Sequence, residues 1–509
     1  MRLVLLLAMA LLLLGCAESA ESVEKKLVEV EPTKTPPEIT TLPQHHSWPS
    51  MKGDESSGMF YPSSLPRKPE VKFRVSRETY QSSLLPVSVP LAEKDVVFVA
   101  SRQKIYALTP EGETVWQKDF YDMYNRFVES YALGKHLYVG TSPTGGGGSA
   151  AVVVALSKDS GKEVWRAEIG EAGGKVTSNM VVFDGKVRAG TVDGIISCFT
   201  ESGEKLWERK VDGIVRGLAY GEGSLFVTTE NGKRLYALSP SSGEELWSYE
   251  AEGTLTTPLY VQGMVITSSY GKVMALKDGK LLWARNAGVR SDSSGNSYIA
   301  TSGKQIFAVS WNKLTVFDLK GNAVGNFTLP EGEEPGIPLA SEDVVVLPTK
   351  SPNAAKIYLL WRGQFLLDSF KVLESDEVWM PSVSAAYGSI YVAVRVPDMV
   401  YRLGDEEKPE IGEINVEFAS GSLKIQTTVK DAQSGIYRVL LFYTQNSEWV
   451  SKDMQLSRRY VMEPIGGYGL EEEQYEAEIP IGGKVEIFVA AIDNAGNYAV
   501  SEIRAYAVE

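Results

Sequence analysis

The residues that most often perform catalysis are scarce in this chain. Its 509 residues include three histidines; His45 and His46 adjoin each other in a segment of low complexity, and His136 flanks a predicted strand. A zinc site needs several nitrogen or sulfur ligands brought together from different segments. No Gly-x-Ser-x-Gly, P-loop or dinucleotide-binding motif lies between a predicted strand and a predicted helix. The sequence therefore gives no support to a histidine metal site, a hydrolase or a nucleotide-binding enzyme.

Three oxygen-bearing side chains near the C-terminus are candidates for calcium binding. Asp431 precedes Ala-Gln-Ser-Gly, and Asp493 and Asn497 bracket Asn-Ala-Gly. Calcium prefers carboxylate and carbonyl oxygens, which these residues supply. Asp and Asn also stabilise turns by hydrogen bonding to their own backbone, and this structural role is the alternative. We predict no bound cofactor and no metal site, and keep the three residues only as calcium candidates.

A second group of polar residues lies where the innermost strands of the predicted repeats begin. Such positions gather around the mouth of a central channel, so basic side chains there could concentrate an anionic ligand. The alternative is that the arginines pair with acidic neighbours at the rim. The candidates for ligand contact are Arg126, Asn179, Arg216, Arg290, Asp292 and Trp379, with Thr256 beside them.

The charge of the chain argues against one large class of partners. With 51 Lys and Arg against 65 Asp and Glu, the formal net charge is −14. Proteins that bind nucleic acid through its phosphates need clustered positive charge. We therefore do not expect a nucleic-acid partner.

The N-terminus has the pattern of an export signal. A single arginine precedes an apolar run, Leu3 to Leu14, which is too short for a comfortable transmembrane span. The run ends in Leu13-Leu-Gly-Cys16, which resembles the lipobox of secreted lipoproteins, where the cysteine is lipidated and becomes the new N-terminus. We expect residues 1–15 to be a signal peptide and Cys16 to carry a lipid anchor. Simple cleavage nearby is the alternative.

Residues 16–47 have the composition of a linker. They are rich in Glu, Lys, Thr and Pro and contain no Phe, Trp or Tyr. Such a segment cannot bury enough apolar surface to fold. We expect a disordered tether that holds the folded part of the chain away from the membrane.

The elements that must position the candidate residues are internal repeats. Five segments share one template: a strand, a tight turn with glycine, and a second strand that ends in tryptophan. Their tryptophans are spaced by 49, 42, 40 and 36 residues, the length of a four-stranded propeller blade. A blade cannot bury both of its faces alone, so neighbouring blades must stack around an axis. The tryptophans that we expect to pack between blades are Trp116, Trp165, Trp207, Trp247 and Trp283.

Further repeats extend the array to eight. Segments 314–327 and 357–370 keep the turn glycine and place phenylalanine where the others have tryptophan. The last repeat, 380–403, lacks an outer strand, and Glu70–Ser76 has the pattern to supply it. Such pairing would close the ring and remove two exposed sheet edges. We predict an all-β chain in which an eight-bladed β-propeller spans residues 48–408.

Cys198 occupies a position that alanine holds in four other repeats. A small residue at a recurring internal position packs in the core, so we expect a buried side chain rather than a reactive thiol. With Cys16 processed, no disulfide can form within the mature chain.

The pattern changes after residue 408. Residues 409–509 lack hairpins that end in tryptophan and contain alternating strands, such as 423–429 and 485–491, at the spacing of a small β-sandwich. Their Asp- and Gly-containing turns resemble those of immunoglobulin-like or fibronectin-like modules of extracellular proteins. Modules of this kind usually act as spacers or adhesive domains.

The repeats resemble those of the pyrroloquinoline quinone-like (PQQ-like) propeller family, and Trp48-Pro-Ser-Met-Lys-Gly-Asp resembles the lead-in common in that family. The resemblance concerns the fold more than the activity, because fold and function are separable. The quinone-dependent dehydrogenases of the family hold their cofactor beside calcium and often against a disulfide of adjacent cysteines. This sequence has no such cysteine pair, so we expect a protein that is not an enzyme. A quinone-dependent dehydrogenase is the least favoured alternative.

These features together predict an exported, lipid-anchored protein that faces the periplasm or the cell exterior. Its propeller loops would bind an envelope or surface protein, or a polymer, and the sandwich would extend or dock it as a scaffold. The alternative within this class is a lipoprotein of the outer-membrane β-barrel assembly machinery. The lipobox and the repeats of this chain resemble those of that lipoprotein, which has no added sandwich domain.

Overall fold

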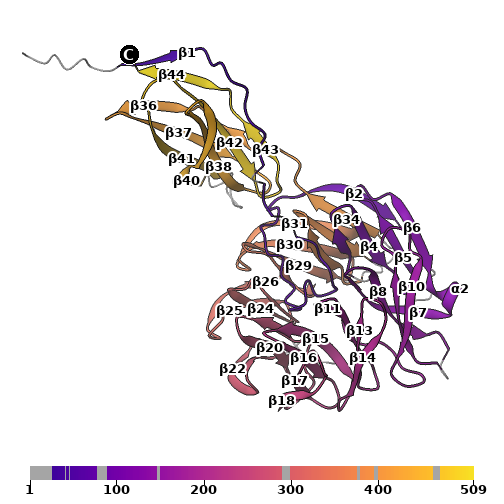
Figure 1. The fold of residues 1–509 in the computed structure, drawn as a ribbon. Helices are drawn as coiled ribbons and strands as arrows, with labels where there is room; N and C mark the ends of the chain where they lie inside the picture. The colour runs from indigo at the N-terminus through magenta and orange to yellow at the C-terminus, as the bar shows by residue number, and fades with distance from the viewer. Residues whose placement is uncertain are drawn as a thin grey trace, which may run out of the picture.

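Nearly all of the regular structure in this chain is β-strand (Figure 1). Helix α2 (Phe120–Tyr124) is five residues long. Within the described residues, no helix combines the length and the apolar character needed to cross a membrane. Cys16, His45, Arg290 and Asp292 lie outside the described residues. The structure, a computed structural model, describes residues 26–40, 42–44, 46–76, 89–145, 149–288, 298–374, 379–394, 399–461 and 471–508.

Sheets of antiparallel strands follow one another along the chain. Between residues 70 and 404 the described residues form eight of them, seven with four strands and one with five. The first four are β3 (Leu91–Glu93), β4 (Val96–Ala100), β5 (Lys104–Leu108) and β6 (Thr114–Asp119); β7 (Arg126–Leu133), β8 (Leu137–Pro143), β9 (Ala151–Leu156) and β10 (Glu163–Ile169); β11 (Val181–Phe183), β12 (Lys186–Gly190), β13 (Ile195–Thr200) and β14 (Lys205–Lys210); and β15 (Val215–Gly221), β16 (Ser224–Thr229), β17 (Arg234–Leu238) and β18 (Glu245–Glu250).

The eighth sheet joins two distant parts of the chain. Its outer strand is β2, which comes before the first sheet and pairs with β34 from Glu70↔Gly404 to Ser76↔Met399. The remaining four are β19 (Leu259–Val261), β20 (Met264–Ser269), β21 (Lys272–Lys277) and β22 (Lys280–Asn286); β23 (Tyr298–Thr301), β24 (Gln305–Ser310), β25 (Lys313–Asp318) and β26 (Ala323–Thr328); β27 (Glu334–Pro335), β28 (Leu339–Ala340), β29 (Val344–Ser351), β30 (Ala354–Trp361) and β31 (Phe365–Glu374); and β32 (Ser382–Ala386), β33 (Ser389–Val394), β34 (Met399–Gly404) and β2 (Glu70–Ser76).

Neighbouring sheets pack face to face in a ring. The innermost strands β7, β11, β15 and β19 contact one another in turn, and β3 of the first sheet contacts β32 of the last. Middle strands such as β9 are buried at every residue, because each sheet lies between two others and has two apolar faces. The predicted β-propeller is therefore confirmed.

Residues 46–61, which we call the capping segment, cover one face of the ring. Trp48 in this segment is buried, and its backbone pairs with Ala92. We call this the capped face; the loop face, on the opposite side, carries the loops between the second and third strands of each sheet. Six carbonyls of the segment accept hydrogen bonds from backbone N–H groups at or near the C-terminal ends of innermost strands. The pairs, carbonyl first, are His46 with Tyr387, Pro49 with Leu133, Glu55 with Tyr220, Ser56 with Tyr260, Gly58 with Thr301, and Met59 with Ala340.

The expectation that residues 16–47 form a disordered tether is wrong for part of that segment. Leu27–Val30 forms β1, which pairs antiparallel with β44 (Arg504–Val508), and Thr33 then hydrogen bonds to Glu486. Figure 1 shows this stretch running along the C-terminal domain before it reaches the propeller. The segment has no apolar core of its own, and pairing with the edge of a distant sheet supplies the hydrogen bonds that order it. The composition of the segment could not reveal a partner 453 residues away.

The C-terminal region forms two sheets around a core of their own. Leu423 and Ile425 of one sheet pack with Leu441 and Val489 of the other. The closer likeness to an immunoglobulin or fibronectin module stays a prediction. The first sheet contains β35 (Glu410–Ile411), β36 (Asn415–Ala419), β37 (Ser422–Lys430), β41 (Glu471–Pro480) and β40 (Gln455–Val461), and the second contains β1, β44, β42 (Val485–Asp493), β43 (Tyr498–Val500), β38 (Ile436–Gln445) and β39 (Glu448–Asp453).

Candidate functional site

The loop face of the propeller carries exposed aromatic side chains, which together with Met123 we call the aromatic group. Tyr270 is 54% exposed and Trp311 is 61% exposed, and they lie in the β20–β21 and β24–β25 loops. Tyr121 and Met123 project from α2, and Trp379 precedes β32. Aromatic and methionine side chains are enriched at the centres of protein interfaces. The loop face therefore offers anchors for the surface of another protein.

Local packing fixes part of the aromatic group. The side chain of Asp119 caps α2 by accepting a hydrogen bond from the N–H of Asp122 at 2.9 Å. The ring of Tyr121 packs 5.8 Å from the ring of Phe127, measured between centroids. A Cβ at Gly253 would lie 2.1 Å from the ring of Tyr270, so this glycine makes room for the tyrosine. The rings are therefore supported from below while their outer surfaces face solvent.

A cavity of about 300 Å³ lies inside the ring. The capping segment contributes Lys52 and Ser57 to it, and the walls come from several sheets and connectors, including Arg216 and Thr256. Burial lowers the pKa of Lys52 to about 8. Lys52 is thus mostly protonated at neutral pH, and two cationic side chains line the cavity. Such a site favours an anionic group, such as a carboxylate.

The predicted channel-mouth residues have different surroundings. Arg216 lines the cavity and also forms an ion pair with Glu230 at 3.3 Å, as the alternative interpretation proposed. Arg126 donates to the carbonyl of Ala150 at 2.9 Å. Asn179 is buried and does not line the cavity. It ties the capping segment to β15, through hydrogen bonds to Ser57 Oγ at 3.0 Å and to the carbonyl of Leu218 at 2.9 Å.

The repeated tryptophans lie between adjacent sheets. The indole N–H of Trp116 donates to the carbonyl of Lys158 at 2.6 Å, and that of Trp165 donates to the carbonyl of Glu201 at 2.8 Å. Trp207 and Trp283 make the same kind of bond, to Pro240 and Leu319. In each case the acceptor belongs to a turn of the next sheet. The tryptophan thus fastens one sheet to its neighbour.

His46, His136 and Cys198, the histidines and the cysteine that the structure describes, each have structural surroundings. His46 lies in the capping segment, with its ring 6.2 Å from that of Tyr61, rather than in a solvated linker. His136 packs against Tyr138. Cys198 is buried in β13, and burial raises the pKa of its thiol.

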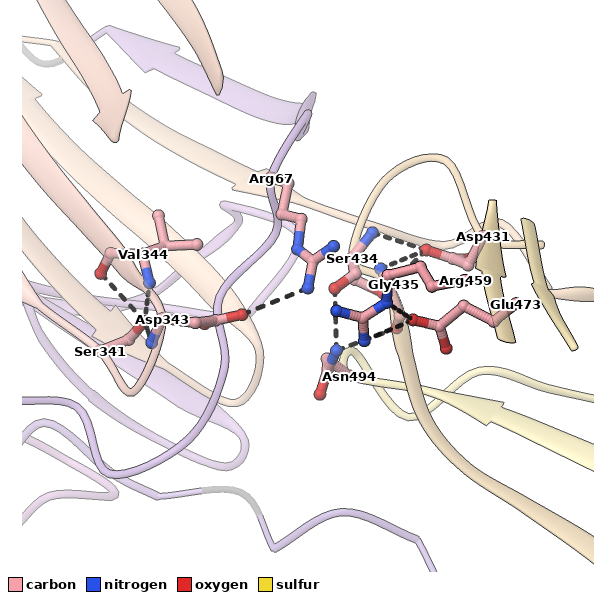
Figure 2. A network of polar contacts seen from close by, with 10 residues as sticks. All are labelled: Arg67, Ser341, Asp343, Val344, Asp431, Ser434, Gly435, Arg459, Glu473 and Asn494. Atoms are coloured by element: carbon pink, nitrogen blue, oxygen red, sulfur yellow. Dashed lines mark hydrogen bonds and ion pairs between the residues drawn. The ribbon is translucent and has the colours of Figure 1, made fainter. Parts of the chain in front are cut away.

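The propeller and the sandwich meet around Arg67 (Figure 2). The backbone N–H groups of Arg67 and Lys68 donate to the carbonyl of Gln433 at 2.6 and 3.1 Å. The guanidinium of Arg67 lies 3.5 Å from a carboxylate oxygen of Asp343 and 4.6 Å from the ring centre of Trp361. Burial raises the pKa of Asp343, and the charge of Arg67 only partly offsets that effect. The two domains are thus joined by defined contacts as well as by the linker.

Sequence reasoning missed several residues of these sites. Lys52 belongs to the family-like lead-in, where Asp54 and Glu55 follow it closely, so nothing in the sequence separates it from an ordinary surface lysine. Trp311 breaks the alternation between two predicted strands, in Ser-Trp-Asn-Lys, which marks it as a loop residue. Arg67 had no signal, since its partners lie far away in sequence.

A closed ring of stacked antiparallel sheets with a docked two-sheet domain defines this chain as a β-propeller protein with an added β-sandwich. The family model for outer membrane protein assembly factor BamB matches residues 101–210 and 192–341. Those residues contain the five tryptophan-ending repeats. The chain is a β-propeller protein built from PQQ-like repeats.

Known proteins with similar sequences bear the same name, outer membrane protein assembly factor BamB. Outer membrane protein assembly factor BamB of Yersinia pestis is 26% identical over 249 residues, which are 42% of this chain and 61% of that protein. BamB of Nitrosomonas eutropha is 28% identical over 132 residues, 26% of this chain and 31% of that protein. The matches thus span less than two thirds of the length of these relatives.

Solved structures resemble the propeller part. The crystal structure of the computationally designed Ika8 protein has a TM-score of 0.52 at 14% identity, and the match covers 67% of this chain and all of that one (100%). The crystal structure of BamB from Moraxella catarrhalis has a TM-score of 0.48 at 14% identity, over 66% of this chain and 98% of that one. The similarity to Ika8 supports the fold alone.

Proposed function

We propose that this chain is an exported, membrane-associated assembly factor that binds another protein through the loop face of its propeller. The observation that carries the proposal is the aromatic group, which places exposed anchors from several sheets on the face opposite the capping segment. The match to the BamB model supports a role in outer-membrane protein assembly over a general scaffold for proteins or polymers. The rigid ring holds the loops in fixed positions, which lowers the entropy cost of binding.

The cavity adds a polar element to this proposed interface. Lys52 and Arg216 would receive an acidic side chain or a chain-terminal carboxylate of the partner, while the aromatic group covers its apolar surface. We propose no catalytic role, in keeping with relatives that are named assembly factors.

The proposed lipid anchor at Cys16 places the sandwich close to the membrane. Residues 17–26 separate Cys16 from β1, and ten residues span at most about 35 Å when fully extended. Because β1 pairs with β44, the anchor would reach the sandwich first and the propeller second. Mass spectrometry of the mature protein is expected to find a lipid-modified N-terminal Cys16, and Cys16→Ser is expected to move the protein out of the detergent phase. An unmodified N-terminus elsewhere would rule the anchor out.

Site-specific crosslinking tests the binding face. A photoreactive amino acid at position 311 or 270 is expected to capture a protein partner in intact cells. The matched control is position 246, where Leu246 is as exposed as Tyr270 but lies on outer strand β18. Trp311→Ala should reduce capture from position 270 without lowering thermal stability, because the side chain is mostly exposed. Equal capture at positions 246 and 311, or none at the loop face, would contradict the proposal.

A further inference from the structure

Three aspartates converge where the propeller passes into the sandwich. Asp405 follows β34, the last propeller strand, while Asp431 follows β37 and Asp493 ends β42. One carboxylate oxygen from each lies within 4.8 Å of the other two. Asp405 is 7% exposed and Asp493 is fully buried, whereas Asp431 is partly buried. Two of these residues were calcium candidates by sequence, and Asp405 is the member that the sequence did not reveal.

Hydrogen bonds account for part of this cluster. One oxygen of Asp431 accepts from the N–H groups of Ser434 and Gly435, at 2.7 and 2.6 Å (Figure 2). Asn497 donates to Asp493 from its backbone and from its side chain, both at 2.8 Å. These are the turn-stabilising bonds that the sequence offered as the alternative. They position the carboxylates but leave three acidic groups side by side.

Asp405 contains an oxygen that these bonds do not satisfy. Its Oδ1 accepts from the N–H of Glu407 at 2.9 Å. Its Oδ2 is buried and accepts no hydrogen bond from the residues that the structure describes. A buried polar atom without a partner is costly, and a carboxylate more so than a neutral group. An unsatisfied oxygen of this kind, on a residue that is clustered with two other carboxylates, indicates a missing positive ligand.

The electrostatics of the cluster point the same way. Burial raises the pKa of Asp405, the side chain of Ser434 only partly offsets that effect, and the negative charge of Asp431 adds to it. Burial also raises the pKa of Asp493 to about 7, and the charges of Asp431 and Asp405 add to that effect. The negative charges around them thus make Asp405 and Asp493 harder to ionise. A cation in their midst would remove this repulsion.

We propose that Asp405, Asp431 and Asp493 bind a divalent cation, calcium, which fastens the sandwich to the propeller. Calcium binds oxygen ligands only and tolerates irregular geometry, with backbone carbonyls and water completing its coordination. Asp405 comes from the propeller side of the linker and the other two from the sandwich, so the ion would lock the angle between the domains. The inference is independent of the proposed function, because it concerns the junction and not the loop face.

Calcium titration of the whole protein tests the site. Protein treated with chelator is expected to bind calcium by calorimetry at about pH 8, above the raised pKa of Asp493, and its unfolding midpoint is expected to rise with calcium concentration. Asp405→Asn and Asp493→Asn keep the side-chain shape and should abolish both effects. Asp184→Asn, at an exposed carboxylate, is the matched control and should retain them.

Two outcomes would overturn the site. If calcium leaves the wild-type midpoint unchanged and Asp405→Asn raises it, the cluster is held by a shared proton and not by a metal. If calcium raises the midpoint equally in the wild type and in Asp405→Asn, the ion binds elsewhere. Magnesium, which demands a more regular geometry, is expected to give the smaller shift. Circular dichroism of each variant establishes that the comparison is made on folded protein.

Discussion

Thr33 donates two hydrogen bonds to the same carboxylate oxygen of Glu486, from its backbone N–H at 2.9 Å and from its hydroxyl at 2.6 Å. The N–H of Lys34 donates to the other oxygen at 2.9 Å. The indole of Trp449 then donates to the carbonyl of Thr35 at 2.8 Å. With the pairing of β1 and β44, these bonds attach the N-terminal segment to the C-terminal domain. Both ends of the described chain are thus held by one small domain.

The first prediction concerns Glu486→Gln. The substitution removes the charge and replaces one acceptor oxygen with an NH₂ group, which cannot accept from Thr33 or Lys34. We expect the free energy that holds residues 27–35 in place to fall by about 1–3 kcal/mol, the cost of disrupting hydrogen bonds to a charged group. Hydrogen exchange of the amides in β1 measures this loss. Glu502→Gln, at an exposed position, should leave the exchange unchanged, and equal protection in both variants would contradict the prediction.

The second prediction concerns the stability of the docked β1 segment at low pH. Burial raises the pKa of Glu486, but hydrogen bonds from Thr33, Lys484 and Lys34 outweigh it, so the pKa lies below its ordinary value. A depressed pKa in the folded state stabilises the fold above the unfolded pKa of about 4.3, and this contribution is lost as the pH falls through the folded pKa. Protection of the β1 amides should therefore drop in acid below about pH 4. A Glu486→Gln variant with the same acid-induced drop would argue against Glu486 as the cause.

Local repetition explains how much of this structure the sequence could predict. Trp165 and the turn glycines recur at the spacing of a blade, so the propeller follows from the pattern. The docking of Thr33 on Glu486 could not be predicted, because it joins two segments that have no shared pattern. The same holds for Asp405, since its neighbours Asp431 and Asp493 become visible as partners only when the domains are placed together. Long-range contacts between unlike segments produce no repeating pattern in the sequence.

The third prediction compares two tryptophans. Trp165 donates to the carbonyl of Glu201 at 2.8 Å, whereas the indole N–H of Trp247 has no hydrogen-bond partner in the described part of the chain. Phenylalanine keeps the ring and removes the donor. We expect Trp165→Phe to lower the free energy of unfolding by about 1 kcal/mol more than Trp247→Phe does, the value of one neutral hydrogen bond. Urea unfolding of the two variants measures the difference, and equal losses would mean that the bond contributes nothing.

The fourth prediction separates backbone strain from steric clash at the turn glycines. Gly161 and Gly223 both have positive φ, at 65° and 76°. A Cβ on Gly161 would lie 2.6 Å from the ring of Trp116, whereas a Cβ on Gly223 would meet nothing within 4 Å. Gly223→Ala should therefore lose only the strain of a left-handed residue, about 1 kcal/mol. Gly161→Ala should lose about 1–3 kcal/mol more, because the indole must move away from its packing between the sheets.

The double variant shows whether that extra loss comes from the tryptophan. With Trp116→Ala already in place, the ring is gone and the added Cβ of Gly161→Ala has room. The further cost of Gly161→Ala should then shrink towards that of Gly223→Ala, which a double-mutant cycle from urea unfolding measures directly. A cost that stays unchanged in the Trp116→Ala background would place its origin in the backbone of the turn. The contact between the turn of one sheet and the tryptophan of the previous one would then be ordinary packing rather than the reason for glycine.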